Sequence, residues 1–208
     1  MKELSASIES LKDGNISSVI RERIKEFSEV REFGNERIFE ELCFCILTAN
    51  CAAKSCIEVQ KRINTGFLNY SEEELRTKLK DYGYRFPNIR AKYIIEARTH
   101  ILEINNKINS RMDENLLREW LAKTIKGLGY KEASHFLRNI GFKNIAIIDF
   151  HIIDILDKFG IIQKPKTLSV KKYKEIEQIL TKIGERVNLD LNELDLYLWY
   201  METSEVLK

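Results

Sequence analysis

The sequence predicts an all-α protein, and three observations support this prediction. Hydrophobic residues recur at i, i+3 and i+4 along almost the whole chain, as they do in helices with one buried face. Strict alternation of apolar and polar residues, which is typical of half-buried strands, is nowhere sustained. The 208 residues include only 2 Pro and 9 Gly, so few positions interrupt a helix. We expect about ten helices with short connections.

The helical pattern runs through the chain in order. Apolar residues at helical spacing begin in 16–27 and continue in 38–46, where the predicted helix ends near Asn50. Further amphipathic runs cover 71–82, 88–107, 112–125, 131–140, 150–159, 170–187 and 191–202. Pro87 and Pro165 stand where a helix begins or a loop runs.

Composition excludes several classes of protein. A hydrophobic content of 44% is ordinary for a globular chain and argues against disorder. No window approaches about 18 uninterrupted apolar residues, so we expect no membrane span. The first residues, MKELSASIESLKDGN, lack the apolar core of a secretory signal, and we expect a cytoplasmic protein. The formal net charge is only +2, and such a small total by itself argues against a nucleic-acid binder.

The four cysteines, Cys43, Cys45, Cys51 and Cys56, lie within one short stretch. They form no Cys-x-x-Cys pair, and no later cysteine completes a zinc site or an iron–sulfur loop. We therefore interpret them as reduced core thiols and expect no metal.

The most informative window is 121–151, LAKTIKGLGYKEASHFLRNIGFKNIAIIDFH. It predicts a helix, a turn through Lys126, Gly127 and Gly129, and a second helix that starts near Lys131. Glycines that allow positive φ, followed by a helix N-terminus with unpaired N–H groups, are typical of an anion site, and a phosphodiester is a natural anion for it. The alternative is a tight turn between two packed helices.

Lys131 falls in the first turn of the second helix. A positive charge there opposes the helix dipole, which favours a neutral amine, and a neutral amine is a nucleophile that forms Schiff bases. Asp149 follows the apolar run 145–148 and precedes another helical pattern, so we expect it to be an ionised N-cap. A rigid carboxylate could stabilise a cationic transition state. The alternatives are a solvated lysine and a purely structural cap.

These stretches closely resemble the prokaryotic type-2 8-oxoguanine DNA glycosylase/AP lyases of the helix–hairpin–helix DNA glycosylase superfamily. The matching segments are ELCFCILTAN, YRFPNIRAKYI, IKGLGYKEASHFLRNIGF, AIIDFH and LDLYLWY, which extend from residue 41 to near the C-terminus. The resemblance implies a bifunctional enzyme that removes 8-oxoguanine from double-stranded DNA and then cleaves the strand. Lys131 falls on the nucleophile that forms the Schiff base, and Asp149 on the aspartate that supports the oxocarbenium-like transition state. No metal or organic cofactor is implied.

The resemblance also implies binding roles. Extrusion of the damaged nucleotide needs a residue that fills the gap and a pocket that receives the base. Asn50 matches the gap-filling residue. The implied base pocket comprises Phe86, His135, Trp199 and Lys208. The implied DNA contacts, besides Asn50, are Lys126, Gly127, Gly129 and His151. The position of Phe150 is usually basic in the family, and two interpretations stay open: loss of the cation weakens a phosphate contact, or Phe150 packs against its neighbours.

By resemblance we expect two lobes, with a helical barrel over 34–142 that contains the hairpin at about 121–138, and a second lobe of 1–33 and 143–208. Lys131 and Asp149 would face each other across the cleft. We expect a monomer that acts at the nucleoid of a prokaryotic cell. Two alternatives stay open, a related lyase for oxidised pyrimidines and a non-catalytic helix–hairpin–helix DNA-binding module.

The position of the charges matters more than their sum. Residues 84–98 hold four basic residues against Glu96, a local excess of 4 − 1 = +3, and residues 121–138 hold four against Glu132, also 4 − 1 = +3. Acidic residues concentrate elsewhere, in 71–75 and 188–195. We therefore expect one basic face at the hairpin.

Overall fold

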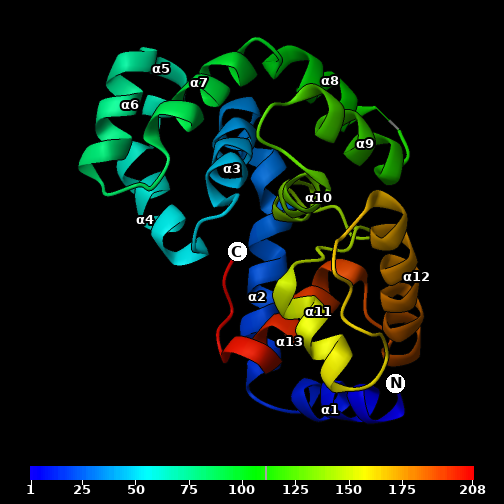
Figure 1. Cartoon of the computed structure of the whole chain (residues 1–208). Coiled ribbons are helices and arrows are strands. Elements are labelled where there is room, and N and C mark those ends of the chain that lie inside the picture. The colour runs from blue at the N-terminus through cyan, green and yellow to red at the C-terminus, as the bar shows by residue number, and fades with distance from the viewer. Residues whose placement is uncertain (111) are drawn as a thin grey trace. The chain divides into compact units, whose positions relative to one another are not determined.

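The computed structural model describes residues 1–110 and 112–208. Within these residues the chain forms thirteen α-helices and one 3₁₀ helix, without a strand, in agreement with the all-α prediction (Figure 1). The chain divides into two compact units, one of Met1–Ser28 with Gly141–Lys208 and the other of Glu29–Ile140. We call them the terminal unit and the hairpin unit. The expected lobe boundaries lie a few residues away from these limits.

The hairpin unit is organised around α3 (Asn35–Thr48), in which every residue from 38 to 48 is buried. A helix that is buried all round belongs to the interior of a domain. It contacts α4 (Ala53–Ile63), α7 (Pro87–Arg98) and α10 (Tyr130–Asn139), which lie around it in Figure 1. The remaining elements of this unit are η1 (Val30–Phe33), α5 (Gly66–Asn69), α6 (Glu72–Asp81), α8 (Ile101–Asn109) and α9 (Glu114–Thr124).

The terminal unit combines both ends of the chain. It contains α1 (Lys2–Lys12), nearly all of α2 (Ile16–Glu29), α11 (Phe150–Lys158), α12 (Val170–Val187) and α13 (Leu191–Thr203). Helix α13 contacts α1, α11 and α12, and α1 also contacts α12 (Figure 1). The N- and C-terminal segments therefore share one core.

Most predicted helices are confirmed within two or three residues, but the run at 88–107 is not one helix. It is divided into α7 and α8 around Thr99 and His100. The Thr99 hydroxyl donates to the Glu96 carbonyl at 2.8 Å, and the His100 N–H closes a short turn onto Ala97 at 3.0 Å. Side-chain competition of this kind ends a helix although the hydrophobic period continues. The structure also adds α1, α4 and the short α5, which the sequence analysis did not assign.

Candidate active site and nucleic-acid interface

The predicted hairpin is formed by α9, the turn 125–129 and α10, and the two helices contact each other. Gly127 has φ +88°, and a Cβ atom there would lie 2.7 Å from Cδ2 of Tyr93. Glycine is therefore required both by the backbone conformation and by the close approach of the tyrosine ring. Gly129 differs from our expectation, because its φ of −89° lies outside the left-handed region. Only one of the two glycines makes use of positive φ.

Two carboxylates accept hydrogen bonds from the hairpin turn. The Gly129 N–H donates to the Glu132 carboxylate at 3.2 Å. The Lys126 ammonium pairs with Glu96, with Nζ–O distances of 2.8 and 3.0 Å, and this hydrogen bond raises the pKa of Lys126. A DNA phosphate that binds these two groups would have to displace carboxylate oxygens, which have similar acceptor chemistry.

Lys131 is the second residue of α10 and is half-buried. The predicted position in the first turn of a helix is thus confirmed. No carboxylate in the described part of the chain forms an ion pair with it. The nearby Cys56 thiol stays neutral, because burial is the main factor that raises the pKa of Cys56 to about 12. Cys56 therefore provides no negative charge that could pair with the Lys131 side chain.

Asn50 follows the end of α3 and has φ +63°. The carbonyl groups before it are held by side chains from other segments. The Leu47 oxygen accepts from the Tyr84 hydroxyl at 2.6 Å and from the Cys56 thiol at 3.4 Å. The Ala49 oxygen accepts from the Arg90 guanidinium at 2.8 Å. Because the last carbonyls of a helix lack intrahelical partners, these bonds fix the turn that presents Asn50.

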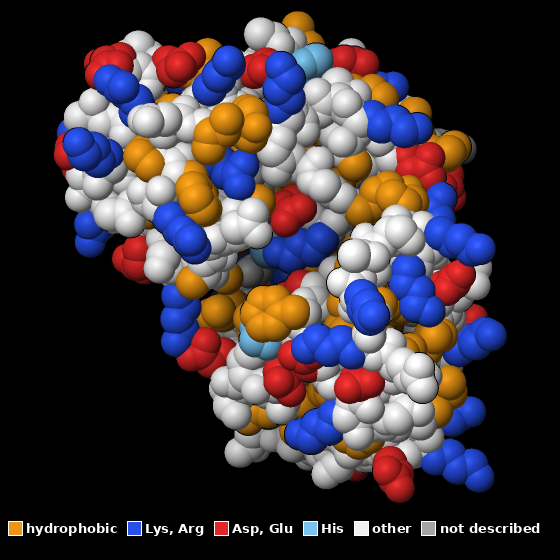
Figure 2. All heavy atoms as spheres, in the orientation of Figure 1, with side chains coloured by type: hydrophobic (Ala, Val, Ile, Leu, Met, Phe, Trp, Pro, Cys, Tyr) orange, Lys and Arg blue, Asp and Glu red, His pale blue; other side chains and the backbone are white. Residues whose placement is uncertain are grey.

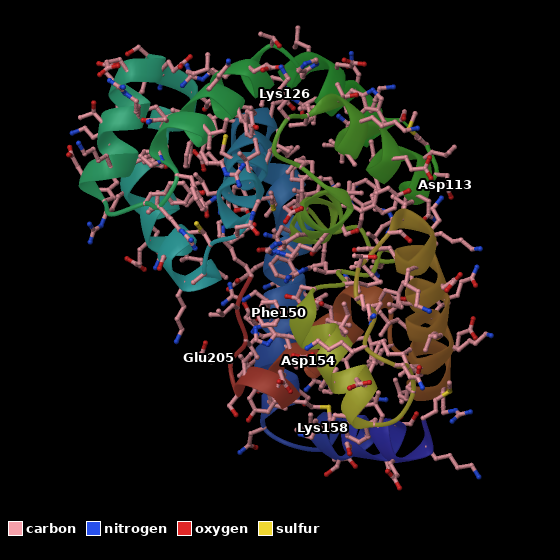
Figure 3. The ribbon with its side chains drawn as sticks, viewed as in Figure 1. Asp113, Lys126, Phe150, Asp154, Lys158 and Glu205 are labelled. Atoms are coloured by element: carbon pink, nitrogen blue, oxygen red, sulfur yellow. The ribbon has the colours of Figure 1, made fainter. Side chains whose placement is uncertain are left out.

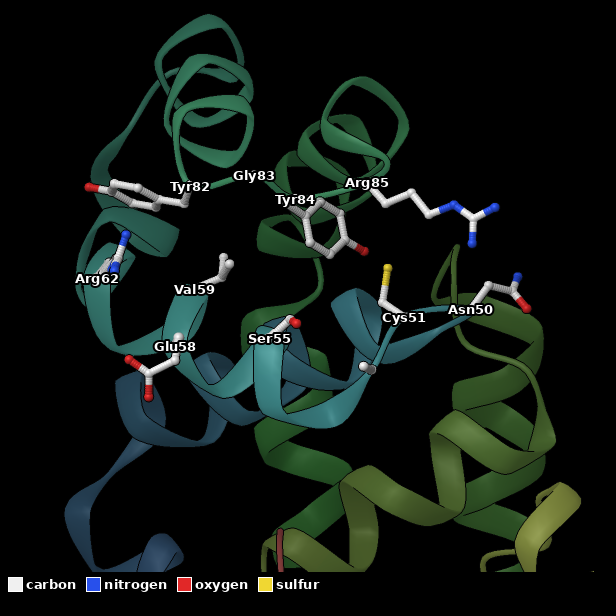
Figure 4. Close-up of a pocket in the computed structure, with 11 residues that line it drawn as sticks. Asn50, Cys51, Ser55, Glu58, Val59, Arg62, Tyr82, Gly83, Tyr84 and Arg85 are labelled. Atoms are coloured by element: carbon white, nitrogen blue, oxygen red, sulfur yellow. The ribbon is translucent and has the colours of Figure 1, made fainter.

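A cavity of about 420 Å³ lies next to Asn50 within the hairpin unit. In Figure 4, Asn50 and Arg85 stand at one end of the cavity, and Arg62 and Tyr82 at the other. The Arg62 guanidinium lies 5.4 Å from the centre of the Tyr82 ring. The sequence analysis missed this cavity, because its walls come from 50–62 and 82–85 and no local pattern connects the two segments.

Phe86 and His135 were expected to border the base pocket. Phe86 precedes Pro87, is half-buried, and lies beneath the Arg85 guanidinium at 4.9 Å from its ring centre. The His135 side chain is 6% exposed, and its ring packs edge-on against Phe44 with centroids 5.5 Å apart. His135 therefore belongs to the packed interior of the hairpin unit, and the pocket roles of both residues stay predictions.

In the terminal unit, Asp149 is the N-cap of α11, as predicted. Its carboxylate accepts from the Ile152 N–H at 3.1 Å, and no lysine or arginine among the described residues pairs with it. The segment before it, residues 145–148, is buried and belongs to no helix. Two side chains of α12 form hydrogen bonds with the backbone of this segment. The Tyr173 hydroxyl donates to the Ala146 carbonyl and accepts from the Ile148 N–H. The Glu177 carboxylate accepts from the Ala146 N–H. These bonds hold the segment that carries Asp149.

His151 and Trp199, which were predicted separately, are in contact. Their ring centroids are 4.5 Å apart in an edge-to-face arrangement. The indole Nε1 of Trp199 is buried without a hydrogen-bond acceptor among the described residues. Such a donor is costly to bury unless something accepts from it, and a ligand acceptor would remove that cost. Lys208 lies in the segment after α13 and is partly exposed.

The excess of basic residues counted in 84–98 and 121–138 is larger than the positive charge that these segments expose to solvent. Arg90 and Arg138, which contribute to the two basic windows, are 8% and 4% exposed. Arg98 is half-buried and donates to the carbonyl groups of Gly66 and Phe67. On the face seen in Figure 2, basic and acidic side chains are mixed. The basic surface at the hairpin is therefore smaller than the sequence predicts.

The described residues contain neither a candidate membrane-spanning helix nor a candidate metal-binding cluster. None of their helices is long and apolar enough to cross a membrane. No group of three or more His, Cys, Asp or Glu side chains among them could hold a metal ion, and the four cysteines are free thiols.

An all-α chain with a glycine-containing hairpin, a lysine in the first turn after it and a capping aspartate has the features of the helix–hairpin–helix DNA glycosylases. More specifically, the chain belongs to the 8-oxoguanine DNA glycosylase family, whose model matches residues 20–189. It is 50% identical over 207 residues to an 8-oxoguanine DNA glycosylase/AP lyase of Korarchaeum cryptofilum, which covers 99% of this chain and 98% of the relative.

Solved structures agree with this assignment. The Methanocaldococcus jannaschii 8-oxoguanine glycosylase/lyase, in complex with a 15mer DNA containing 8-oxoguanine, matches with a TM-score of 0.95 and 51% identity, covering 99% of this chain and 100% of that one. The 8-oxoguanine DNA glycosylase of Thermotoga maritima matches with a TM-score of 0.92 and 39% identity, covering 100% and 99%.

Proposed function

We propose that this protein removes 8-oxoguanine from double-stranded DNA and then cleaves the strand as an AP lyase. The observation that carries the proposal is the similarity over the whole chain to the Methanocaldococcus jannaschii enzyme, whose structure contains DNA with 8-oxoguanine. The matches to relatives named 8-oxoguanine DNA glycosylase/AP lyase also span nearly the full length of both chains. The proposal includes no metal or organic cofactor, because an amine and a carboxylate are sufficient for the chemistry.

In this proposal Lys131 is the nucleophile. Its neutral amine attacks C1′ of the deoxyribose, the bond from C1′ to the base breaks, and the base leaves. The sugar ring opens to give a Schiff base between Lys131 and C1′. Loss of a proton from C2′ then expels the 3′ phosphate by β-elimination. The place of Lys131 in the first turn of α10, directly after the hairpin turn, supports this role.

Asp149 supplies the negative charge that the first step requires. As C1′ loses its base, positive charge develops on the sugar, and a fixed carboxylate stabilises that charge. Capping by the Ile152 N–H holds Asp149 in one orientation. One carboxylate oxygen serves the cap, and the other is available for the substrate.

Recognition in the proposal uses residues of both units. Asn50 fills the gap left by the extruded nucleotide, and its turn is fixed by Arg90 and Tyr84. The base is received by Phe86, His135, Trp199 and Lys208. Lys126, Gly127, Gly129 and His151 contact the DNA. We further propose that the protein acts as a monomer at the nucleoid.

Borohydride trapping on an 8-oxoguanine duplex tests the proposal. The unmodified protein should give a covalent protein–DNA adduct, and Lys131→Gln should abolish it while DNA binding persists. Lys123→Gln, at an exposed lysine of α9, is the matched control and should trap normally. Absence of an adduct with binding intact would leave only a non-catalytic DNA-binding module. Faster single-turnover excision of thymine glycol than of 8-oxoguanine would instead identify an enzyme for oxidised pyrimidines.

A further inference from the structure

Phe150 is an exposed aromatic residue that the proposed mechanism does not use. It is the first residue of α11, directly after Asp149, and 63% of it is exposed (Figure 3). Single exposed hydrophobic residues are common on protein surfaces and by themselves mean little. What distinguishes Phe150 is the arrangement of the rings beneath it.

The Phe150 ring is the outer member of a three-ring cluster. Its centroid lies 3.9 Å from that of His151, with the planes inclined by 36°. The other side of the cluster is formed by Trp199 of α13, which meets the His151 ring edge-on. Helices α11 and α13 pack against each other, so the cluster rests on the core of the terminal unit. The exposed ring is therefore supported from below and presents its outer surface to solvent.

Phe150 is the only exposed hydrophobic residue of α11, all of whose residues the structure describes. Later positions that reach the surface are charged, with Asp154 paired with Lys164, and with Asp157 and Lys158 exposed (Figure 3). A protein partner would be expected to use a broader apolar patch. A single supported ring suits a planar ligand of similar size, and the bases of nucleic acid have such a π-face.

We propose that Phe150 is a stacking platform for a nucleobase of the bound DNA. This inference rests on the proposed function, because it requires that the terminal unit contacts DNA near Asp149. Stacking of this kind tolerates any base and involves no charge. Phe150 would thus add affinity that does not depend on counterion release, which is useful in a chain with a small net positive charge.

Binding measurements separate stacking from charge. Fluorescence anisotropy would use a duplex with a tetrahydrofuran abasic analogue, which resists cleavage, at about 50 and 200 mM salt. We expect Phe150→Ala to weaken binding by about 5- to 150-fold at both concentrations, the range that corresponds to loss of a base–aromatic stack, with an unchanged salt slope. Phe150→Trp should retain the affinity, and Phe150→Leu should lose most of it.

The matched control is Phe33→Ala, because Phe33 is 71% exposed on η1. It should bind like the unmodified protein. An equal loss in Phe33→Ala, or full affinity in Phe150→Ala, would overturn the inference. The unmodified protein must bind this duplex for the comparison to be made. Trapping on an 8-oxoguanine duplex tests the proposed function in a separate experiment, so its failure is recognised separately.

Photocrosslinking identifies the base. Duplexes carrying 5-iodouracil at successive positions around the lesion would be irradiated with the unmodified protein, and adducts would be located by mass spectrometry. We expect an adduct on Phe150 at one or two adjacent positions and its loss in Phe150→Ala. Adducts that form only on other residues at every position would overturn the inference.

Discussion

The Arg90 guanidinium, carried by α7, donates a hydrogen bond of 2.8 Å to the carbonyl oxygen of Ala49 at the end of α3. This bond connects two segments that are about forty residues apart in the sequence and fixes the residue immediately before Asn50. Arg90 is 8% exposed, so the carbonyl has little access to water that could replace the guanidinium. The orientation of Asn50 therefore depends on a buried arginine.

Replacement of Arg90 tests this dependence. Arg90→Met should lower the free energy of unfolding by about 1.5–3 kcal/mol, because it removes a hydrogen bond to a charged donor and leaves the carbonyl unsatisfied. It should also weaken binding to a lesion-containing duplex, and Arg90→Lys should recover part of both. Urea denaturation and anisotropy measure the two effects. Unchanged DNA binding in a destabilised Arg90→Met would limit the role of Arg90 to folding.

The Asp149 carboxylate caps α11 and, in the proposed mechanism, also supplies a negative charge. Two substitutions separate these roles. Asp149→Asn keeps an N-cap acceptor for the Ile152 N–H but removes the charge. We expect unfolding free energy within about 0.5 kcal/mol of the unmodified protein, and at least about a hundredfold slower single-turnover excision. Asp149→Ala should lose activity and about 1 kcal/mol of stability. Normal excision by Asp149→Asn would contradict the proposed role.

Gly127→Ala should destabilise the hairpin for two reasons. The left-handed conformation at φ +88° disfavours a side chain by about 1–2 kcal/mol. The new Cβ would also lie 2.7 Å from the Tyr93 ring. Gly83→Ala is the control, because Gly83 has φ +72° but nothing within 4 Å of its Cβ position. Chemical denaturation should show a larger loss for Gly127→Ala, and equal losses would exclude the Tyr93 contact as a factor.

The Lys126–Glu96 pair should compete with DNA. Glu96→Gln removes the carboxylate that raises the pKa of Lys126, yet leaves the lysine protonated at neutral pH. With Lys126 free to contact a phosphate, duplex affinity should rise at low salt, and the slope of log K against log salt should steepen by about one. Lys126→Gln in the same background should reverse the gain. A gain that survives this second substitution would show that Lys126 is not the contact.

Cys56 should be resistant to alkylation. With its pKa raised from an ordinary value of about 9 to about 12, roughly one thiol in ten thousand is ionised at pH 8. Iodoacetamide should therefore modify the partly exposed Cys51 first, and Cys56 only after unfolding. The stability that the protonated thiol contributes is complete below pH 9 and is lost as the pH rises toward 12. Mass spectrometry of the labelled protein measures the order, and early labelling of Cys56 would contradict it.

Features that depend on neighbouring residues could be predicted from the amino-acid sequence alone. Helical periodicity located α9, α10 and α11 within two or three residues, because the apolar spacing of a helix is written in consecutive positions. The cap at Asp149 and the first-turn position of Lys131 were also predictable, since each depends on its immediate neighbours. The family resemblance rests on the same short segments.

Contacts between side chains that are distant in the sequence depend on how the helices pack. Glu96 forms an ion pair with Lys126, thirty residues away in the sequence, and Arg90 donates a hydrogen bond to Ala49. The His151 ring contacts the Phe150 ring on its own helix and the edge of Trp199 on another. No periodicity encodes such pairs, because they arise when separate helices pack and bury their side chains together. The sequence thus determined where the proposed reactive groups lie on their helices, and packing determined which charges stay exposed and which aromatic ring remains open to solvent.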